Sequence, residues 1–269
     1  MQESKLKMAR FSTLCSSSGG NSCYVGTASS GILIDAGTNN KQLLLSMEQS
    51  GISPDAVKAV FVTHEHDDHI SGLRVFATRK NIPVYATGGT LSGLLGKGVI
   101  DGKFPFEKIM PEGVSVGEMH VTYFPTSHDA KESCGYKIIL PDKKVGVCTD
   151  TGKMTREIVR NLCDCDLVLI ESNYDENLLD FGPYPPYLKA RIRSEHGHLS
   201  NNVCAETVGE LLEAGVRRFV LGHLSRENNT PDRAFSCTNS YLKRMGAELN
   251  KDYILEVAPV GSMGKYIVF

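Results

Sequence analysis

Apolar residues along the chain fall into two patterns that alternate with each other. Short continuous apolar runs predict strands, and stretches with apolar residues three or four positions apart predict helices. Strands are expected at 9–14, 22–26, 31–35, 59–63, 83–86, 166–170, 218–222 and 253–257, and helices at 41–51, 70–80, 154–162, 199–214 and 232–245, with β-rich sequence from 86 to about 150. This alternation predicts an α/β fold. Because no repeat, low-complexity stretch or linker interrupts it, we expect a single domain over 1–269.

Ionisable residues stand at the ends of several expected strands. The residues that follow an apolar run in this way are Asp35, His64, Asp150, Glu171 and His223. In open α/β sheets, reactive side chains collect at the carboxyl ends of strands, where the loops converge into a crevice. Packing alone does not explain such residues at five strand ends, so we expect them to meet in one site.

The amino-acid composition indicates the general class of protein but not its function. Hydrophobic residues make up 41% of the chain and charged residues 22%, which is typical of a globular protein with a substantial core. The formal net charge is −2, so any contact with nucleic acid has to come from a local basic patch. A polar N-terminal segment and the lack of a long apolar segment predict a cytoplasmic protein with no membrane span.

The eight cysteines are scattered along the chain and form no CxxC pair. In a chain with no secretion signal, they are expected to be reduced and packed thiols. Cys163-Asp164-Cys165 offers metal binding as an alternative, but it lies in an apolar run that enters a strand. We therefore favour packing for these two thiols.

The run Thr63-His64-Glu65-His66-Asp67-Asp68-His69 is dense in side chains that bind metals, and it holds three of the chain's eight histidines. Two histidines separated by one residue can point to one cation, while the aspartate and histidine that follow turn toward a second. Neutral imidazole and carboxylate groups suit divalent first-row cations. A solvated polar loop is the alternative. The position of the run between an apolar strand and a helix favours the metal site.

The pattern His64-x-His66-x-Asp68-His69 resembles the signature motif of the metallo-β-lactamase superfamily. Segments similar to its other motifs follow in the family order at 33–37, 126–129, 148–152 and 221–225. The resemblance implies a hydrolase with a two-metal site. It also implies a particular form of the α/β class, the four-layered αβ/βα sandwich of the metallo-β-lactamase type.

Carried over to this chain, the motif residues would hold two divalent cations, with Zn, Mn or Fe as the candidates. One cation would have three histidine ligands, the other an aspartate and two histidines, and a further aspartate would bridge the two. In that order, the implied ligands are His64, His66 and His128; Asp68, His69 and His223; and Asp150. Asp35 would brace the histidine loop from behind the ligands. A hydroxide that bridges the two cations would be the nucleophile.

A second group of residues indicates which kind of bond is cleaved. Glu171 and the segments 195–201 and 222–226 resemble the corresponding run in RNase Z-type nucleases. There, a glutamate at a strand end supports a histidine that acts on the leaving group. The likeness implies that His198 is the general acid or stabilises the transition state, and that Glu171 orients it. The implied catalytic set is Asp68, His198 and Glu171.

Likeness to the WalJ/YycJ family of bacterial proteins extends over nearly the whole chain. It rests on the segments 16–22, 171–175, 182–192, 197–201 and 223–229. It implies a 5′-to-3′ exonuclease on duplex DNA that is linked to DNA mismatch repair. One turn departs from the family pattern, because many relatives have Ser-Gly-Ser-x-Gly-Asn where this chain has Ser-Ser-Ser-Gly-Gly-Asn at 16–21.

Contacts with the substrate are expected from polar and basic residues beside these motifs. Lys189, Arg191 and Arg193 form a short basic run near the His198 loop. Such cations position a nucleic-acid backbone without reading its sequence, although a solvated helix face explains the run equally well. Further candidates for substrate binding are Ser18, Asn21, Asn201, Arg226 and Asn228.

Two other functions stay open. The first is a small-molecule or RNA phosphodiesterase on the same two-metal site. The interval from Asp150 to His223 has no room for a tRNA-binding arm or an inserted β-CASP domain, which favours a small substrate. The Glu171–His198 pair argues against thioester and lactam hydrolysis, which does not need that acid. The second is a regulatory protein with a vestigial metal site, which the complete ligand set disfavours. The sequence leaves a homodimer open.

Overall fold

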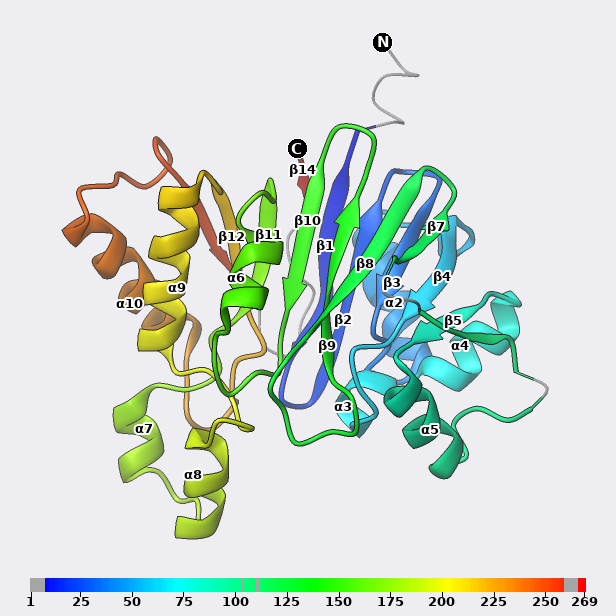
Figure 1. Cartoon of the computed structure of the whole chain (residues 1–269), viewed down its shortest axis with the longest axis horizontal. Helices are drawn as coiled ribbons and strands as arrows, with labels where there is room; N and C mark the ends of the chain where they lie inside the picture. The colour runs from blue at the N-terminus through cyan, green and yellow to red at the C-terminus, as the bar shows by residue number, and fades with distance from the viewer. Residues whose placement is uncertain (1–7, 103, 110–111, 259–265) are drawn as a thin grey trace.

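The computed structural model describes residues 8–102, 104–109, 112–258 and 266–269. Within them, two seven-stranded sheets pack face to face, and helices cover the outer side of each sheet (Figure 1). The layers therefore run helix, sheet, sheet, helix. This arrangement confirms the predicted α/β fold class and the αβ/βα sandwich.

The first sheet has the strand order β14-β1-β2-β3-β4-β5-β6. Its strands are β1 (Arg10–Ser17), β2 (Gly20–Gly26), β3 (Gly31–Ile34), β4 (Val57–Phe61), β5 (Val84–Ala86), β6 (Phe106–Lys108) and β14 (Tyr266–Val268). The helices on its side are α2 (Asn40–Gln49), α3 (Asp67–Ile70), α4 (Leu73–Lys80) and α5 (Gly88–Gly96), with the short 3-10 helix η1 (Pro54–Ala56) before β4.

The second sheet has the order β13-β12-β11-β10-β9-β8-β7. Its strands are β7 (Val114–Val116), β8 (Met119–Pro125), β9 (Cys134–Ile139), β10 (Lys144–Cys148), β11 (Leu167–Glu171), β12 (Arg218–Gly222) and β13 (Ile254–Val257). The helices α6 (Arg156–Leu162), α9 (Asn201–Ala214) and α10 (Pro231–Arg244) cover it, and α7 (Glu176–Phe181) and α8 (Pro186–Arg193) project below it in Figure 1.

Strand direction decides where the loops with ionisable residues meet. β1 and β2 form an antiparallel hairpin with Ser18 and Gly19 in the turn. From β3 to β6 the strands are parallel, and so are β10 to β13. Parallel strands share the edge at which their carboxyl ends lie. The loops after β3, β4, β10, β11 and β12 therefore gather at the lower edge of the sandwich in Figure 1, where the site lies.

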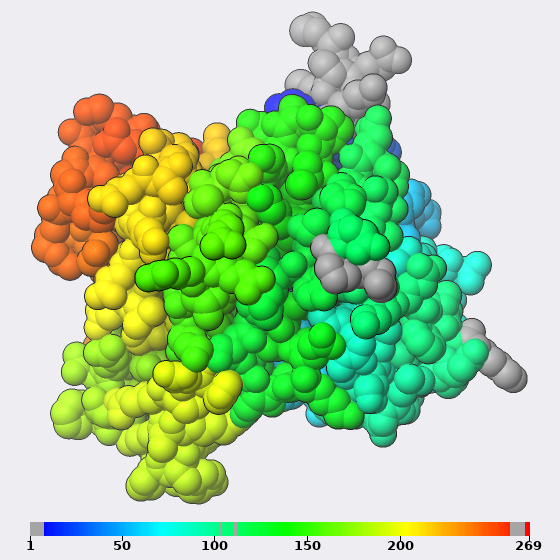
Figure 2. Space-filling model, viewed as in Figure 1, coloured from blue at the N-terminus to red at the C-terminus, as the bar shows by residue number. Residues whose placement is uncertain are grey.

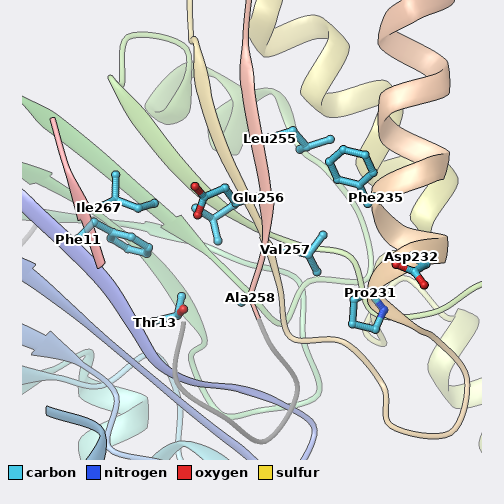
Figure 3. Close-up of a pocket in the computed structure, with 11 residues that line it drawn as sticks. Phe11, Thr13, Pro231, Asp232, Phe235, Leu255, Glu256, Val257, Ala258 and Ile267 are labelled. Atoms are coloured by element: carbon cyan, nitrogen blue, oxygen red, sulfur yellow. The ribbon is translucent and has the colours of Figure 1, made fainter. Parts of the chain in front are cut away.

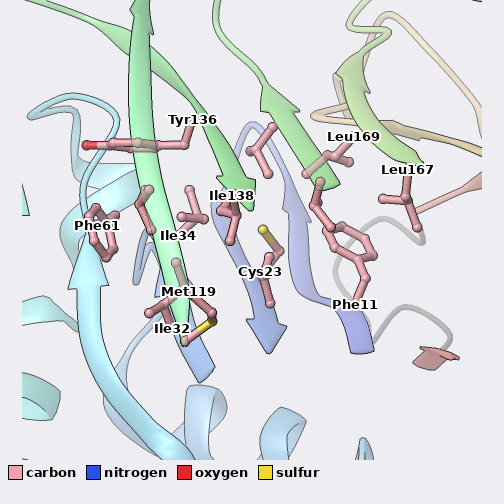
Figure 4. Packing of buried hydrophobic residues seen from close by; sticks show 14 of the residues in the cluster. Phe11, Cys23, Ile32, Ile34, Phe61, Met119, Tyr136, Ile138, Leu167 and Leu169 are labelled. Atoms are coloured by element: carbon pink, nitrogen blue, oxygen red, sulfur yellow. The ribbon is translucent and has the colours of Figure 1, made fainter. Parts of the chain in front are cut away.

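The main core fills the space between the two sheets (Figure 4). Within it, Phe61 is buried, stacked on Tyr85 at a ring distance of 5.0 Å and edge-on to Tyr136 at 5.5 Å. The hydroxyl of Tyr136 donates to the carbonyl of Val62 at 2.7 Å, so this buried polar group is satisfied. Two further apolar clusters lie between the sheets and their outer helices. The three clusters cover both faces of β4 and β11, the strands next to the site residues.

Most expected strands and helices are present, with their ends shifted by a few residues. The expected β-rich structure is wrong for 88–96, where α5 forms. The side chain of Thr87 caps this helix by accepting from the N–H of Thr90, and Leu91 and Leu94 are buried. Because its glycines weaken helix propensity, capping and burial stabilise α5.

The expected helix at 70–80 is divided into α3 and α4. At the division, the N–H of Gly72 donates to the carbonyl of Ala36 at 2.8 Å, and the N–H of Ala36 donates to the carbonyl of His69 at 2.9 Å. These bonds attach the metal-motif loop to the loop after β3. For α7, α8 and β14, the sequence pattern indicates no element. Among the described residues, no helix is long and apolar enough to cross a bilayer.

Candidate metal centre

Three residues after strands take an unusual backbone conformation at the lower edge. Asp35, Asp150 and His223 follow β3, β10 and β12, and their φ angles are 61°, 55° and 54°. Left-handed backbone is uncommon for residues other than glycine and is costly unless the surroundings hold it in place. Here it turns the chain sharply at the strand end. Asp35 and Asp150 thereby reach His69 in the segment after β4, and His223 reaches Asp68 of the same segment.

Potential ligand atoms converge into overlapping groups at this edge. Within each group, one ligand atom per residue lies within 4.8 Å of the others. The groups are His64, His66 and His128; Asp68, His69 and His223; His64, His69 and Asp150; and Asp150, Glu171, His198 and His223. The first two groups correspond to the two ligand sets that the family resemblance implies. The third and fourth place Asp150 between them.

Individual distances place the carboxylates among the imidazoles. Nε2 of His69 lies 3.4 Å from Oδ2 of Asp68 and 3.2 Å from Oδ2 of Asp150. Oδ1 of Asp150 lies 3.7 Å from Nε2 of His128. Nε2 of His223 lies 3.6 Å from Oδ2 of Asp68. The bridging position expected for Asp150 is therefore geometrically available.

Buried polar atoms without a hydrogen-bond partner indicate whether these residues could bind metal cations. Nε2 of His64, Nε2 of His223 and Oδ2 of Asp150 are buried and make no hydrogen bond to any described residue. Leaving such atoms unpaired costs about 1–3 kcal/mol each. All three are electron-pair donors in groups of the size that one cation fills. Imidazole nitrogen and carboxylate oxygen suit Zn²⁺ and Mn²⁺, so the donor set fits divalent cations.

Asp35 contacts the segment with the metal motif from behind the potential ligands. Its carboxylate accepts hydrogen bonds from the N–H of Thr63 at 2.8 Å, the hydroxyl of Thr63 at 2.9 Å and Nδ1 of His69 at 2.8 Å. The bond to Nδ1 leaves Nε2 of His69 for a cation. Burial raises the pKa of Asp35, although His69 and Thr63 oppose this shift.

Glu171 supports two histidines at once. Its Oε1 accepts from Nδ1 of His198 at 2.7 Å and from Nδ1 of His223 at 2.9 Å. Its Oε2 accepts from the N–H groups of Thr151 at 3.0 Å and Leu199 at 3.2 Å. Burial alone would raise the pKa of Glu171, but the two histidines outweigh burial and hold it below its usual value. The sequence indicated the contact with His198 and gave no sign of the one with His223.

The buried charges shift the titration of the potential ligands in opposite directions. Burial and the neighbouring His69 lower the pKa of His64 well below its usual value. Burial would lower the pKa of His223 as well, but Asp150, Asp68 and Glu171 outweigh it and raise that pKa to about 10. Binding of a cation has to displace this proton, so metal affinity is coupled to pH.

The five residues proposed as substrate contacts fall into two groups. Asn21 lies beside the ligands, with Nδ2 at 3.2 Å from both Oδ2 of Asp68 and Nε2 of His69. Ser18 and Arg226 are exposed, and Nη2 of Arg226 lies 3.4 Å from Oγ of Ser17. A cavity of about 180 Å³ adjoins Arg226 and the β1–β2 turn. Ser18 and Arg226 therefore lie on the surface beside the β1–β2 turn, whereas Asn21 is buried next to the potential ligands.

Asn201 and Asn228 lie in the interior. Oδ1 of Asn201 accepts from the hydroxyl of Ser172 at 2.7 Å, and its Nδ2 donates to Asn229 at 3.0 Å. Asn228 is fully buried, and its Nδ2 donates to the hydroxyl of Ser225 at 3.3 Å. Neither side chain reaches the surface, because both are buried and hydrogen-bonded to neighbouring loop residues.

Two residues that hold His223 had no predicted role. Oγ of Ser16 accepts from the N–H of His223 at 2.8 Å, and Nδ2 of Asn173 donates to its carbonyl at 2.8 Å. Both fix the left-handed backbone of His223. Ser16 and Asn173 lie in segments that resemble the WalJ/YycJ family. This resemblance was the only feature of the sequence that could have pointed to them, because neither residue is near His223 in the chain.

A second cavity is larger but lies away from these ligands. Its volume is about 480 Å³, and it opens between β1, β12, β13 and the start of α10 (Figure 3). Its lining is largely apolar, with Asp232 and Glu256 as the acidic members, and contains no residue of the ligand groups. The size of a cavity therefore does not identify the reactive site in this protein.

Comparison with known proteins agrees with this geometry. A profile described as "Beta-lactamase superfamily domain" matches residues 31–224. Exodeoxyribonuclease YycJ of Bacillus anthracis is 34% identical over 239 residues, which cover 88% of this chain and 90% of the relative. Exodeoxyribonuclease WalJ of Streptococcus pneumoniae (strain D39) is 35% identical over 230 residues, which cover 84% and 85%. The metallo-β-lactamase fold protein YhfI from Bacillus subtilis has a TM-score of 0.72 at 15% identity, over 98% of this chain and all of that one.

The chain belongs to the metallo-β-lactamase superfamily and is a metal-dependent hydrolase. Within that superfamily, it belongs to the YycJ/WalJ family.

Proposed function

We propose that this protein is a metal-dependent DNA exonuclease that acts 5′ to 3′ on duplex DNA. The names of its YycJ and WalJ relatives support the reaction class. The observation that carries the proposal is the 2.7 Å contact between Nδ1 of His198 and Oε1 of Glu171 beside the ligand groups. The leaving alkoxide of a phosphodiester is a poor leaving group, so a positioned proton donor there is useful. The family resemblance adds the link to DNA mismatch repair.

His198 is placed to transfer a proton. Its ring lies 5.0 Å from that of His128 and 5.2 Å from that of His223, so it stands between the two sets of potential ligands. Glu171 occupies Nδ1, which leaves Nε2 as the atom that delivers the proton to the leaving oxygen. The side chain is partly exposed, unlike Glu171 behind it. Substrate can therefore reach His198, while water is excluded from its partner.

We propose two cations, Zn²⁺ or Mn²⁺ with Fe as an alternative, held by the two ligand sets with Asp150 between them. When bound, they would activate water as a nucleophile near neutral pH and neutralise charge on the phosphate oxygens. Asp68 fits this site, because His69 and His223 hold its pKa well below the usual range although burial opposes them.

Substrate is positioned by the exposed residues Ser18 and Arg226 beside the β1–β2 turn, and Asn21 lies behind them next to the ligands. Arg226 offers a fixed cation for a phosphate next to the β1–β2 turn. Since Asn201 and Asn228 are buried, we propose that they shape the loops that carry Glu171 and His223. Their effect on DNA binding is then indirect.

A panel of substrates tests the function. Duplex DNA labelled at the 5′ or the 3′ end, structured RNA and bis(p-nitrophenyl) phosphate are each incubated with purified enzyme and added Mn²⁺ or Zn²⁺. The expected result is stepwise release of nucleotides from the 5′ end of duplex DNA. Turnover of the small diester alone would replace the nuclease with a small-molecule phosphodiesterase, and preference for RNA would assign an RNA substrate. Lack of all activity in metal-loaded protein would support a regulatory role.

A further inference from the structure

The helices α7 and α8 form a projection beside the metal centre, seen at the lower left of Figures 1 and 2. A small apolar cluster of Tyr174, Leu179 and Ile192 attaches it to the body. Two large apolar side chains on it are far more exposed than elsewhere. Phe181 is 89% exposed and Tyr187 76%, whereas the next among the described residues, Leu95, is 44% exposed. Exposed aromatic side chains on a projection indicate an interaction surface.

The three cations of α8 differ in what they contact. Nζ of Lys189 donates to the carbonyls of Asp180 and Gly182 at 2.8 Å each, and Arg193 pairs with Asp180. Both therefore link α8 to α7. Arg191 instead reaches toward the ligands, and its Nε donates to Oδ2 of Asp129 at 2.5 Å.

Asp129 aligns Arg191 beside the metal centre. Oδ1 of Asp129 lies 3.4 Å from Nε2 of His128, which is a potential ligand. The guanidinium is half exposed, and its terminal amino groups have no hydrogen-bond partner among the described residues. A planar guanidinium with two free amino groups matches the oxygens of a phosphate. The sequence left a solvated helix face as an equal alternative for Arg191, and the contact with Asp129 favours phosphate binding.

Tyr187 lies next to Arg191 on the surface of α8. It precedes Arg191 by four positions in α8, and residues four apart share one face of a helix, with Cβ atoms about 5–6 Å apart. A row of side chains therefore runs from His128 through Asp129 and Arg191 to Tyr187. Aromatic rings next to a cation are the usual means of holding unpaired nucleotides, because every base has a face on which a ring can stack.

We propose that Arg191 and Tyr187 on α8 hold the unpaired end of the DNA strand being digested, with Arg191 on a phosphate and the ring of Tyr187 stacked on a base. This inference rests on the proposed exonuclease function. It goes beyond that function by assigning a binding surface for unpaired nucleotides next to the metal centre. The cation beside the ring favours nucleic acid over a second copy of the chain as the occupant.

A fluorescent reporter at position 187 tests the contact directly. The chain has no tryptophan, so Tyr187→Trp introduces a single tryptophan, which can be excited at a longer wavelength than the remaining tyrosines. In a His198→Ala background that slows cleavage, duplex DNA with an unpaired 5′ end is expected to quench this emission, and blunt duplex to quench it less. Met245→Trp is the matched control, because Met245 is also exposed and caps the far end of α10, about 20 Å from the start of that helix. Equal quenching at both positions, or none at 187, would overturn the proposal.

Kinetics provide the second test. Tyr187→Ala is expected to raise KM for DNA roughly 5- to 150-fold, the equivalent of one stacked base. Tyr187→Phe, which keeps the ring, should behave as the wild type. Arg191→Ala is also expected to raise KM for DNA. Turnover of bis(p-nitrophenyl) phosphate should stay unchanged in Tyr187→Ala, because that substrate does not reach α8.

The two levels of the proposal fail in different ways. If wild-type enzyme does not cleave DNA, the proposed function fails, and the quenching experiment still reports whether α8 binds a strand. If DNA is cleaved while Tyr187→Ala leaves KM and quenching unchanged, only the inference about α8 is overturned. The Tyr187→Ala variant also tests self-association. If it changes the molecular mass of the protein in solution but keeps its affinity for DNA, the surface is a contact between copies of the chain, and the inference about α8 is overturned.

Discussion

The carboxylate of Glu171 holds Nδ1 of His198 at 2.7 Å, and the same oxygen also accepts from Nδ1 of His223 at 2.9 Å. One buried carboxylate thus connects the proposed proton donor to a potential metal ligand. Any change at Glu171 acts on both parts of the site. If His223 and Asp150 are ligands and His198 is not, removal of the His198 imidazole affects only proton transfer.

The first prediction concerns His198→Ala. We expect kcat on DNA to fall about 10²- to 10⁴-fold, which is the usual contribution of a general acid. The fall should be much smaller on bis(p-nitrophenyl) phosphate, because nitrophenolate leaves without protonation. Steady-state kinetics on both substrates measure the difference.

Metal analysis of the same variant is the control for this prediction. Unchanged metal content is expected. A loss of bound metal would show that His198 acts as a ligand with Asp150, Glu171 and His223, with which it also forms a group. A fall in kcat of less than about threefold on DNA, far below the usual range, would contradict the proton-transfer role.

The second prediction concerns Glu171→Gln. Glutamine is neutral and has one acceptor oxygen where the carboxylate has two. Either the two histidines or the N–H groups of Thr151 and Leu199 then face an NH2 group that cannot accept, and both histidines lose the charge that supports them. We expect metal affinity to fall about 10- to 100-fold, together with kcat on DNA. Competition with a chelating dye measures the affinity. Glu195→Gln is the matched control, since Glu195 is exposed and pairs with Lys153 at 2.5 Å. Equal affinities in the two variants would contradict the double role of Glu171.

The third prediction concerns Asp35→Asn. Asp35 accepts from Nδ1 of His69 and from both donors of Thr63. The amide nitrogen of asparagine cannot accept a hydrogen bond, so either His69 or the N–H of Thr63 loses its acceptor, and the negative charge behind His69 is removed. Metal affinity is expected to fall about 10- to 100-fold, as measured by calorimetric titration. Asp55→Asn, at an exposed carboxylate that pairs with Lys80, should bind metal like the wild type.

The fourth prediction concerns removal of metal. Cations bind the folded chain, where the ligands converge, so their removal by a chelator should lower stability. At a free concentration 100 times Kd, binding contributes about 2.7 kcal/mol, which corresponds to a fall in Tm of roughly 5–10 °C on chelation. Calorimetry before and after dialysis against a chelator measures it, and added Zn²⁺ or Mn²⁺ should restore Tm. An identical Tm in both states would argue against metal binding at these residues.

The fifth prediction concerns two buried thiols. Burial raises the pKa of Cys134 and of Cys204 to about 12, although hydrogen bonds involving Tyr136 and Ser172 partly oppose it. Only the thiolate reacts rapidly with alkylating reagents. In native protein at pH 8, iodoacetamide should therefore leave both residues unlabelled, while partly exposed Cys163 serves as the control. Peptide mass spectrometry measures the labelling, and rapid native labelling of Cys134 would contradict its burial.

The same shift has a consequence for stability. A thiol in the unfolded chain has a pKa of about 8.5, so above that pH the unfolded state loses a proton that the folded state keeps up to about 12. The free energy of unfolding should therefore decrease as pH rises from about 8.5, by up to about 1.4 kcal/mol per pH unit for each such thiol. Denaturant unfolding at pH 8 and pH 10 checks the direction.

Local sequence was sufficient for much of the fold. β4 and β11 are apolar runs buried in the sandwich, and such runs predict strands because both faces of each strand are covered. α9 was expected from the spacing of its apolar residues, and Ser200 and Gly215 stand at its two ends. α5 was missed because its stability comes from burial of Leu91 and Leu94 rather than from propensity.

The sequence by itself also indicated which residues would supply ligands, because motif order and strand ends are linear features. Tertiary structure alone decided which polar atoms face one another. Ser16 supports His223 across 207 positions, and Asn201 and Asn228 are buried where the sequence suggested contact with substrate. Of the three α8 cations, Arg191 points to the metal centre while Lys189 and Arg193 link α8 to α7. The physical reason is that hydrophobic periodicity reports which face of an element is buried, whereas hydrogen-bond partners are set by loops that meet only after the two sheets have packed.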